Sequence, residues 1–130
     1  MRSLVLTGMA SDRDCKRFIH PDDQNAFKLN KCNMGMLGEN KGKSGRYHLI
    51  AWRDQTFRVK KWLILKFIDW RPEWQFEFGQ SYFVPEKDMM AKIEAMGWHH
   101  KQSEPYFFVS YNGKKNSRRY WAKDFQKSIE

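Results

Sequence analysis

Residues 46–84 contain three runs that are dense in aromatic and β-branched residues, and no other feature constrains the fold of this chain as strongly. The runs read RYHLIAW, TFRVKKWLILKFIDW and WQFEFGQSYFV. Residues of these types fit a pleated, half-buried surface better than they fit a helix. In the third run the rings of Trp74, Phe76 and Phe78 alternate with polar residues, which is typical of a strand with one buried face. The sequence therefore predicts three strands here.

Two irregular features accompany these strands. Residues 38–45, GENKGKSG, combine three glycines with two lysines and contain nothing that needs burial. We expect a flexible basic loop there. In the second run the alternation shifts just before Trp62, so we also expect a β-bulge near Lys60 and Lys61.

The first third of the chain carries two helix starts. Ser11 stands as an N-cap before Asp12 and Asp14, whose charges suit the positive end of a helix. Pro21 then occupies a typical first helical position, with two acidic residues behind it. These signals predict two short helices.

The last third predicts two more helices and one more strand. After Pro85, four apolar residues recur at helical spacing, and Gly97 is positioned to end the helix. Residues 105–111, PYFFVSY, are typical of a strand. Ser117 caps a final predicted helix. Its buried stripe would consist of three residues four positions apart, Trp121, Phe125 and Ile129.

Together these segments follow the order ααβββαβα. An order of this kind predicts the α+β class, with helices packed on an antiparallel sheet of about four strands. The 130 residues suffice for one domain with a real core and are too few for two comfortable ones, so we expect a single domain over residues 1–130. The hydrophobic content of 41% and the aromatic content of 16% exclude a disordered chain.

Positive charge is concentrated in two segments. The chain carries 24 Lys and Arg against 15 Asp and Glu, which gives a formal charge of +9. Residues 38–66 and 112–127 together hold more than this net charge, so the rest of the chain is slightly acidic. Segregated like charges repel one another, and a polyanion would relieve that repulsion while releasing condensed counterions. Nucleic acid is therefore the favoured partner, and an acidic protein comes second.

The predicted nucleic-acid site combines these cations with aromatic rings. Four residues of the second segment should contact phosphate or sugar: Lys114, Lys115, Arg118 and Arg119. Four residues of the first segment should extend the track: Lys41, Lys43, Lys60 and Lys61. We expect Tyr120 to be exposed and to stack on an unpaired base, which favours RNA or single strands over a duplex. Further rings near the two segments are Tyr47, Trp52, Trp62, Tyr111 and Trp121. The alternative is that the cations form a solvated face and the rings belong to the core.

The sequence thus predicts a small, non-enzymatic protein that binds RNA or DNA. The alternative is an accessory protein of a virus or mobile element that binds and inhibits a host protein or a nucleoprotein complex. It draws on the six Trp, ten Phe and seven Met, which exceed what a small core absorbs. An enzyme ranks third, since no acid, base and nucleophile assemble from spacing alone.

No cofactor or metal site is expected. The spacing of Cys15, His20, Cys32 and His48 lacks the tight ligand pairs of structural zinc sites. Two cysteines are too few for a disulfide framework, so we expect reduced thiols and a cytoplasmic protein. The longest apolar stretch, WLILKFIDW, is nine residues long and contains two charges, so we expect no membrane span.

Overall fold

Two antiparallel sheets organise the chain, one in each half. The computed structural model describes residues 3–74 and 77–126, and its contacts divide the chain into two units, Met1–Trp70 and Arg71–Glu130. The predicted α+β class with antiparallel pairing is confirmed, although strands predominate. The single sheet of about four strands and the order ααβββαβα are wrong, because the two sheets have five and four strands and a different order. The single domain expected over residues 1–130 stays a prediction.

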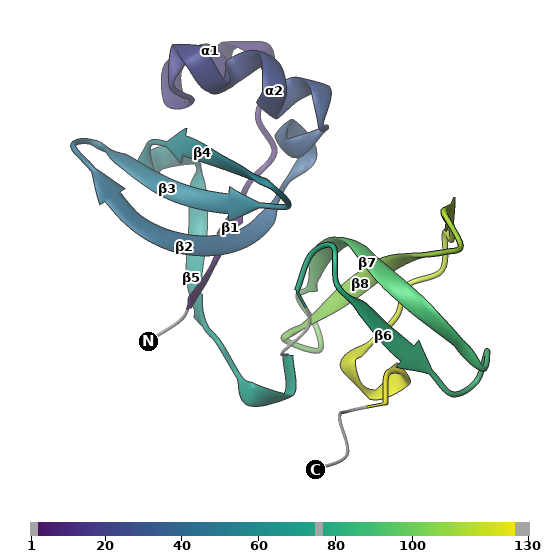
Figure 1. Cartoon of the computed structure of the whole chain (residues 1–130). Coiled ribbons are helices and arrows are strands. Elements are labelled where there is room, and N and C mark those ends of the chain that lie inside the picture. Colours follow the sequence, from purple (N-terminus) through teal and green to yellow (C-terminus); the bar gives the residue numbers. More distant parts are fainter. Residues whose placement is uncertain (1–2, 75–76, 127–130) are drawn as a thin grey trace. The chain divides into compact units, whose positions relative to one another are not determined.

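The first unit is built on a five-stranded sheet of order β4-β3-β2-β1-β5, in which every neighbouring pair is antiparallel. Its strands are β1 (Ser3–Thr7), β2 (Leu37–Ser44), β3 (Tyr47–Trp52), β4 (Gln55–Val59) and β5 (Ile64–Asp69). Figure 1 shows that the sheet is strongly curved, so that β1 and β5 run across the direction of β2 and β3. Its core includes five buried side chains, Leu4, Val5, Ile50, Phe57 and Val59.

Two short helices, α1 (Asp12–Phe18) and α2 (Gln24–Leu29), lie together on one side of this sheet (Figure 1). An edge-to-face ring pair attaches α2 to β4, with 5.4 Å between the centroids of Phe27 and Phe57. Cys15 of α1 is also fully buried, so both helices contribute to the core of the first unit. Among the residues that the structure describes, no helix has the length and apolar character needed to cross a membrane.

Both helix starts follow the predicted local signals. The Ser11 hydroxyl accepts a hydrogen bond from the Asp14 N–H at 3.1 Å, and the Asp14 carboxylate accepts one from the Ser11 N–H at 3.1 Å. This reciprocal pair is a capping box, and it satisfies two backbone donors at the start of α1. Pro21 begins a 3₁₀ turn, Pro21–Asp23, that leads directly into α2.

Two predictions for the first unit are wrong. Residues 38–45 form most of β2 and the start of the turn to β3 instead of a flexible loop. Gly38 permits this pairing, because a Cβ there would lie 2.6 Å from a backbone oxygen of β3. The bulge expected near Lys60 and Lys61 is a complete break between strands, where the 3₁₀ turn Lys61–Leu63 separates β4 from β5.

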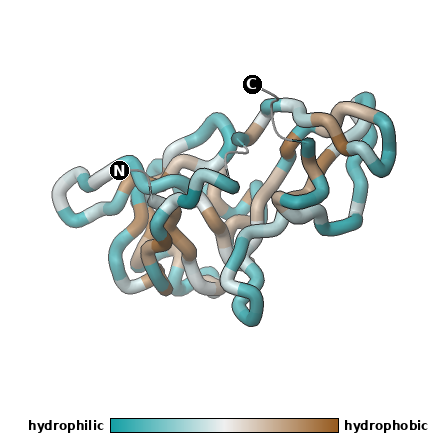
Figure 2. Tube along the Cα trace, turned by 90° about the horizontal axis from the view of Figure 1, so that it is seen from below, coloured by the Kyte–Doolittle hydropathy of each residue, from teal (hydrophilic) through white to brown (hydrophobic). Residues whose placement is uncertain are grey.

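The second unit contains a four-stranded meander of order β6-β7-β8-β9, again antiparallel throughout. Its strands are β6 (Ser81–Val84), β7 (Met89–His99), β8 (Glu104–Tyr111) and β9 (Lys114–Lys115). The sheet contributes to a core of buried residues: Val84, Ala91, Ile93, Phe107, Val109, Tyr120 and Phe125. In Figure 2 the brown, hydrophobic stretches of the tube alternate with teal, hydrophilic ones, and many of the projecting turns are teal.

The helix predicted after Pro85 is wrong, because this segment forms the long strand β7. The four apolar residues fit the helical period, whereas the strand buries the alternate residues Ala91 and Ile93. Met90, the residue before Ala91, points to the opposite face and is 55% exposed. Pairing with β8 between Lys92 and His99 decides the outcome, since it supplies every second backbone group with a partner on a neighbouring strand.

Two strand predictions for the second unit have different outcomes. The strand predicted over residues 105–111 is confirmed as β8. Of the strand predicted over residues 74–84, only β6 is a strand in the described part of the chain. Trp74 ends the 3₁₀ turn Pro72–Trp74, and residues 75 and 76 lie outside the described residues.

The helix predicted after Ser117 is also wrong within the described residues. The chain is extended at Tyr120, where a bridge attaches it to β8. A short 3₁₀ turn, Ala122–Asp124, follows. Ile129, the last member of the predicted stripe, lies outside the described residues.

Candidate nucleic-acid interface

A basic groove lies on the first unit, where the β2–β3 hairpin meets the turn after β4. Six residues line it: Lys43, Arg46, His48, Lys60, Lys61 and Trp62. Strand register explains why they meet, because Lys43 is paired with His48, and His48 is paired with Val59 at the end of β4. The groove has a volume of about 330 Å³, and none of its lining residues is acidic.

The lysines of the groove stand beside aromatic rings. Lys61 Nζ lies 4.8 Å from the centroid of the Trp62 ring, and Lys60 Nζ lies 5.9 Å from that of Tyr47. Trp62 is 71% exposed, which is uncommon for so large an apolar side chain. The groove therefore presents an accessible indole flanked by positive charge.

The surroundings of His48 lower its pKa. Burial lowers this pKa below its ordinary value, and the charges of Lys43 and Lys61 lower it further. The imidazole is therefore neutral at pH 7, and it will take up a proton more readily when an anion offsets those charges. Its ring packs against Phe67 of β5 with 5.4 Å between centroids. Phe67 is 50% exposed, so the aromatic surface continues from the groove onto β5.

The groove gathers three of the four predicted residues of the first segment, Lys43, Lys60 and Lys61. Lys41 is not among its lining residues, and its Nζ lies 3.4 Å from Oε1 of Glu39. Of the rings proposed for stacking in this unit, Trp62 is exposed and Trp52 is buried. The predicted site lacked Arg46 and His48, which line the groove. A signal for both was their position at the start of a strand that follows a lysine-rich segment.

Predicted residues of the second segment lie on the second unit. Lys114 and Lys115 form β9 and are exposed. Arg118 donates a hydrogen bond from Nη2 to Oε2 of Glu86 at 3.0 Å, and Oδ1 of Asp124 lies 4.0 Å from the same nitrogen. This hydrogen bond, together with the charge of Arg118, lowers the pKa of Glu86. Because carboxylates of its own unit offset the charge of Arg118, this residue has less charge to offer a phosphate than predicted.

The prediction of an exposed Tyr120 is wrong, and so is the prediction of a buried Trp121. Tyr120 has no exposed surface, and its hydroxyl accepts a hydrogen bond from the Tyr111 hydroxyl at 2.8 Å. Trp121 is only half-buried. The cause is the extended backbone: Tyr120 exchanges two N–H to oxygen bonds with Phe107, of 2.7 and 2.8 Å, so successive side chains point to opposite faces. Arg119 and Trp121 accordingly flank the buried Tyr120 on the other side.

A comparison with protein families places the chain. Residues 10–126 match a family that is described as a family of unknown function, DUF6960. The chain belongs to the DUF6960 family. This match spans both sheets except for β1, so the groove and the second sheet lie within the DUF6960 region. No match was found among curated proteins, and none was found among solved structures.

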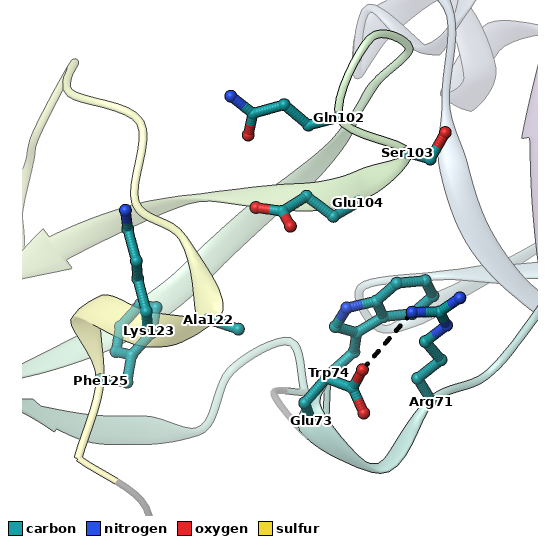
Figure 3. Close-up of a pocket in the computed structure, with 9 residues that line it drawn as sticks. All are labelled: Arg71, Glu73, Trp74, Gln102, Ser103, Glu104, Ala122, Lys123 and Phe125. Atoms are coloured by element: carbon teal, nitrogen blue, oxygen red, sulfur yellow. Dashed lines mark ion pairs between the residues drawn. The ribbon is translucent and has the colours of Figure 1, made fainter.

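The DUF6960 chain has a second cavity, in the second unit, with mixed charge (Figure 3). Its volume is about 480 Å³, and its lining residues are Arg71, Glu73, Trp74, Gln102, Ser103, Glu104, Ala122, Lys123 and Phe125. Arg71 and Glu73 form an ion pair at 3.7 Å. Figure 3 shows Glu104 and Lys123 across the cavity from this pair. Carboxylates and cations therefore both line this cavity, whereas the lining of the groove includes no carboxylate.

Thiols and metal ligands add no further site to the described part of this DUF6960 chain. No three His, Cys, Asp or Glu residues among the described ones are close enough to hold a metal ion. Cys15 and Cys32 are buried thiols. Burial raises the pKa of both, that of Cys32 to about 12, so both are protonated at neutral pH and react poorly. The candidate interface therefore depends on cations, one imidazole and exposed rings.

Proposed function

We propose that the basic groove of the first unit binds single-stranded nucleic acid without catalysis. The observation that carries this proposal is the convergence of four cations on one concave surface: Lys43, Arg46, Lys60 and Lys61. Because no acidic residue lines the groove, these charges repel one another, and phosphates would offset them. The proposal retains the lysines that the sequence predicted for this unit, apart from Lys41.

Salt dependence is the quantitative consequence of this arrangement. Each phosphate contact with a single strand contributes about −0.7 to the slope of log affinity against log salt concentration. The four cations of the groove therefore contribute about −3 to this slope. A protein held by apolar contacts alone would give a slope near zero.

Trp62 is the reason for proposing a single strand. Its ring is 71% exposed and lies in the groove beside Lys61. Stacking of an unpaired base on such a ring contributes roughly 1 to 3 kcal/mol, with little dependence on sequence. In a duplex the base faces are already stacked on one another, so they are inaccessible to the indole. Unpaired RNA and DNA both satisfy this requirement.

The test is a binding measurement on the full chain at several salt concentrations. Fluorescence anisotropy would compare labelled oligo(U), oligo(dT) and a duplex, each of about 12 nucleotides. We expect both single strands to bind more tightly than the duplex. The double variant Lys60→Gln with Lys61→Gln should reduce the magnitude of the salt slope by about 1.4, which corresponds to two lost contacts.

A matched pair of substitutions controls for net charge. Lys28→Gln with Lys31→Gln removes the same charge from the end of α2 and from the turn after it, outside the groove lining. This control should leave the salt slope close to that of the wild-type protein. Equal reductions in both double variants would reject the groove as the binding site, and an unchanged slope in both would do the same.

A second candidate function rests on exposed apolar side chains of the first unit. Met9, Leu29 and Met34 are 71%, 84% and 61% exposed. Methionine is enriched at protein interfaces relative to the rest of the surface. These exposed side chains favour the alternative of a viral or mobile-element accessory protein that binds and inhibits a host protein or nucleoprotein complex. Purified protein free of nucleic acid, with a host protein that co-elutes in low salt and high salt alike, would support this alternative.

A further inference from the structure

The second sheet carries a row of aromatic side chains on the face opposite its core. Alternation along β8 turns Phe107 and Val109 toward the core and places Tyr106 and Phe108 on the other face. Trp121 lies beside Tyr106, because the residue before it bridges to β8. Three rings from two neighbouring segments therefore share this outer face.

Together with His99 at the end of β7, these three rings contact one another in series. The ring centroids are 5.4 Å apart for His99 and Trp121, 5.9 Å for Trp121 and Tyr106, and 5.5 Å for Tyr106 and Phe108. All four side chains are half-buried, so each retains surface that a ligand can reach. Mutual edge-to-face packing also restricts their motion, which reduces the entropy lost when a ligand binds.

The end of the Tyr106 ring lies against the backbone of β7. Its cross-strand partner is Gly97, and a Cβ at that position would lie 2.3 Å from Cζ of the Tyr106 ring. The backbone of β7 therefore covers one face of the ring. The guanidinium carbon of Arg119 lies 4.3 Å from the ring centroid, and Arg119 is exposed. In the free chain this guanidinium covers the face of the ring that β7 leaves open, so a nucleobase reaches that face when the exposed Arg119 swings aside and then covers the base.

Further cations lie at the Phe108 end of the row. Ser110 of β8 is paired with Lys92 of β7 and with Lys115 of β9, so the register places both lysines on the outer face. Both lysines are exposed. The nearby carboxylate of Glu94 accepts a hydrogen bond from the Ser110 hydroxyl at 2.6 Å. Positive charge thus prevails at this end of the row.

We propose that this outer face is a second stacking platform, on which unpaired bases of a nucleic-acid strand lie against Tyr106 and Phe108. Arg119 covers a stacked base, and Lys92 and Lys115 offset the phosphates that follow it. The inference rests on the proposed function, because the ligand is the same polymer. Single-stranded nucleic acid is the occupant that fits, since it offers flat apolar groups and negative charge at regular intervals.

The test substitutes single rings in the full chain. Tyr106→Leu and Phe108→Leu each remove one ring and keep an apolar side chain on the sheet. We expect the affinity for labelled oligo(U) of about 12 nucleotides to fall by about tenfold in each variant. The salt slope should stay unchanged, because neither substitution removes a cation. Circular dichroism and thermal unfolding would verify that both variants fold.

Phe83→Leu is the matched control. Phe83 of β6 is paired with Met90, which is 55% exposed, so it lies on the same outer face. It belongs to none of the ring contacts that form the row. The variant makes the same chemical change as Phe108→Leu and should bind oligo(U) as tightly as the wild-type protein. A tenfold loss in this control would show that the effect does not come from the row, and the platform would be rejected.

Failure of the platform is distinguishable from failure of the groove. Wild-type affinity in Tyr106→Leu and Phe108→Leu, with a reduced salt slope in the Lys60 and Lys61 double variant, rejects the platform and leaves the groove. Absence of any binding to oligo(U) rejects both. Sedimentation gives the third outcome: if the free chain self-associates and Tyr106→Leu makes it monomeric with unchanged oligo(U) affinity, the face is an interface between copies.

Cross-linking covers the case in which a ring variant does not fold. Wild-type protein would be irradiated with oligo(U) that contains 4-thiouridine, and the adducts would be mapped by mass spectrometry. We expect adducts on the peptide that contains Tyr106 and Phe108 as well as on the peptide that contains Trp62. Adducts on the Trp62 peptide alone would overturn the platform.

Discussion

Asp23 accepts three hydrogen bonds from Arg58. The backbone N–H of Arg58 donates to Oδ2 at 2.8 Å, its Nε donates to Oδ2 at 3.0 Å, and its Nη2 donates to Oδ1 at 3.0 Å. Asp23 immediately precedes α2 and Arg58 lies in β4, so the pair joins the helices to the sheet. Although Arg58 belongs to the basic segment 38–66, it is committed to this internal contact and does not line the groove.

Asp23→Asn should therefore reduce the stability of the first unit. We expect the free energy of unfolding to fall by about 2 kcal/mol at pH 7, because an amide loses the charge-assisted bonds. Burial alone would raise the pKa of Asp23, but hydrogen bonds from Arg58 and its charge lower it overall. Because the folded pKa lies below the unfolded one, this stabilisation is complete above about pH 4 and is lost as the pH falls through the folded pKa. Urea unfolding should show that wild type and Asp23→Asn differ less in their free energy of unfolding at pH 3 than at pH 7.

Asp22→Asn is the control for this prediction. Oδ2 of Asp22 lies 3.8 Å from Nη2 of Arg58, and the Asp22 side chain is 78% exposed. Exposed ion pairs of this kind contribute little, so the control should unfold almost as the wild-type protein does. Equal losses for the two variants would contradict the specific role assigned to Asp23.

Protonation of His48 should strengthen nucleic-acid binding. In the free protein, burial and the charges of Lys43 and Lys61 hold the pKa of His48 below its ordinary value. Bound phosphate offsets those charges and raises this pKa, so binding takes up a proton. The affinity for oligo(U) should consequently rise as the pH is lowered from about 7 to about 5.5. Anisotropy at constant salt measures this rise, and His48→Gln should abolish most of it. An equally steep rise in His48→Gln would assign the effect to another group.

Trp62→Ala should weaken binding without altering its salt dependence. Loss of the exposed ring removes one stacked base, which corresponds to about tenfold in affinity for oligo(U). The salt slope should remain that of the wild-type protein, because Lys60 and Lys61 are retained. Leu65→Ala is the control, since Leu65 is a 62% exposed apolar residue of the neighbouring β5 that does not line the groove. A loss in Leu65→Ala as large as that in Trp62→Ala would favour an apolar interface over base stacking.

Local sequence signals predicted the elements that depend on a few adjacent residues. Ser11 capped α1 as expected, because a capping box involves only positions three residues apart. The apolar residues after Pro85 predicted a helix because they fit a helical period, but pairing with β8 makes this segment the strand β7. The predictions for Tyr120 and Trp121 were wrong for a similar reason, since Tyr120 is buried and Trp121 is half-buried. Their orientation depends on the bridge to Phe107, which no local pattern encodes.

Charge density indicated three lysines that line the groove, Lys43, Lys60 and Lys61, but also Lys41, which does not line it. It did not indicate which arginines form other contacts. Lys60 and Lys61 both line the groove, at the point where the extended chain enters the 3₁₀ turn Lys61–Leu63. Arg58 and Arg118 meet their carboxylate partners across sequence separations of 35 and 32 residues. Such contacts arise only from the tertiary fold. A count of cations along the chain therefore overestimates the charge that is available to a partner.

Gly97→Ala should displace the Tyr106 ring while leaving the fold intact. A Cβ at position 97 would lie 2.3 Å from Cζ and 2.4 Å from Oη of Tyr106. These atoms are at the free end of the side chain, so the ring can swing away instead of forcing the strands apart. Because the ring also packs against Phe108 and Trp121, we expect the free energy of unfolding to fall by about 1 to 3 kcal/mol. The affinity for oligo(U) should fall about as far as in Tyr106→Leu, because a tilted ring no longer offers a flat face.

A double variant tests whether Gly97 acts through Tyr106. If both substitutions remove the same stacked base, Gly97→Ala with Tyr106→Leu should bind oligo(U) no more weakly than Tyr106→Leu alone. NMR supplies a direct readout, since a ring that lies against Gly97 shifts the Hα resonances of that residue upfield, and both single variants should remove this shift. Additive losses of affinity in the double variant, or an unchanged Hα shift in Gly97→Ala, would show that the glycine does not set the position of the ring.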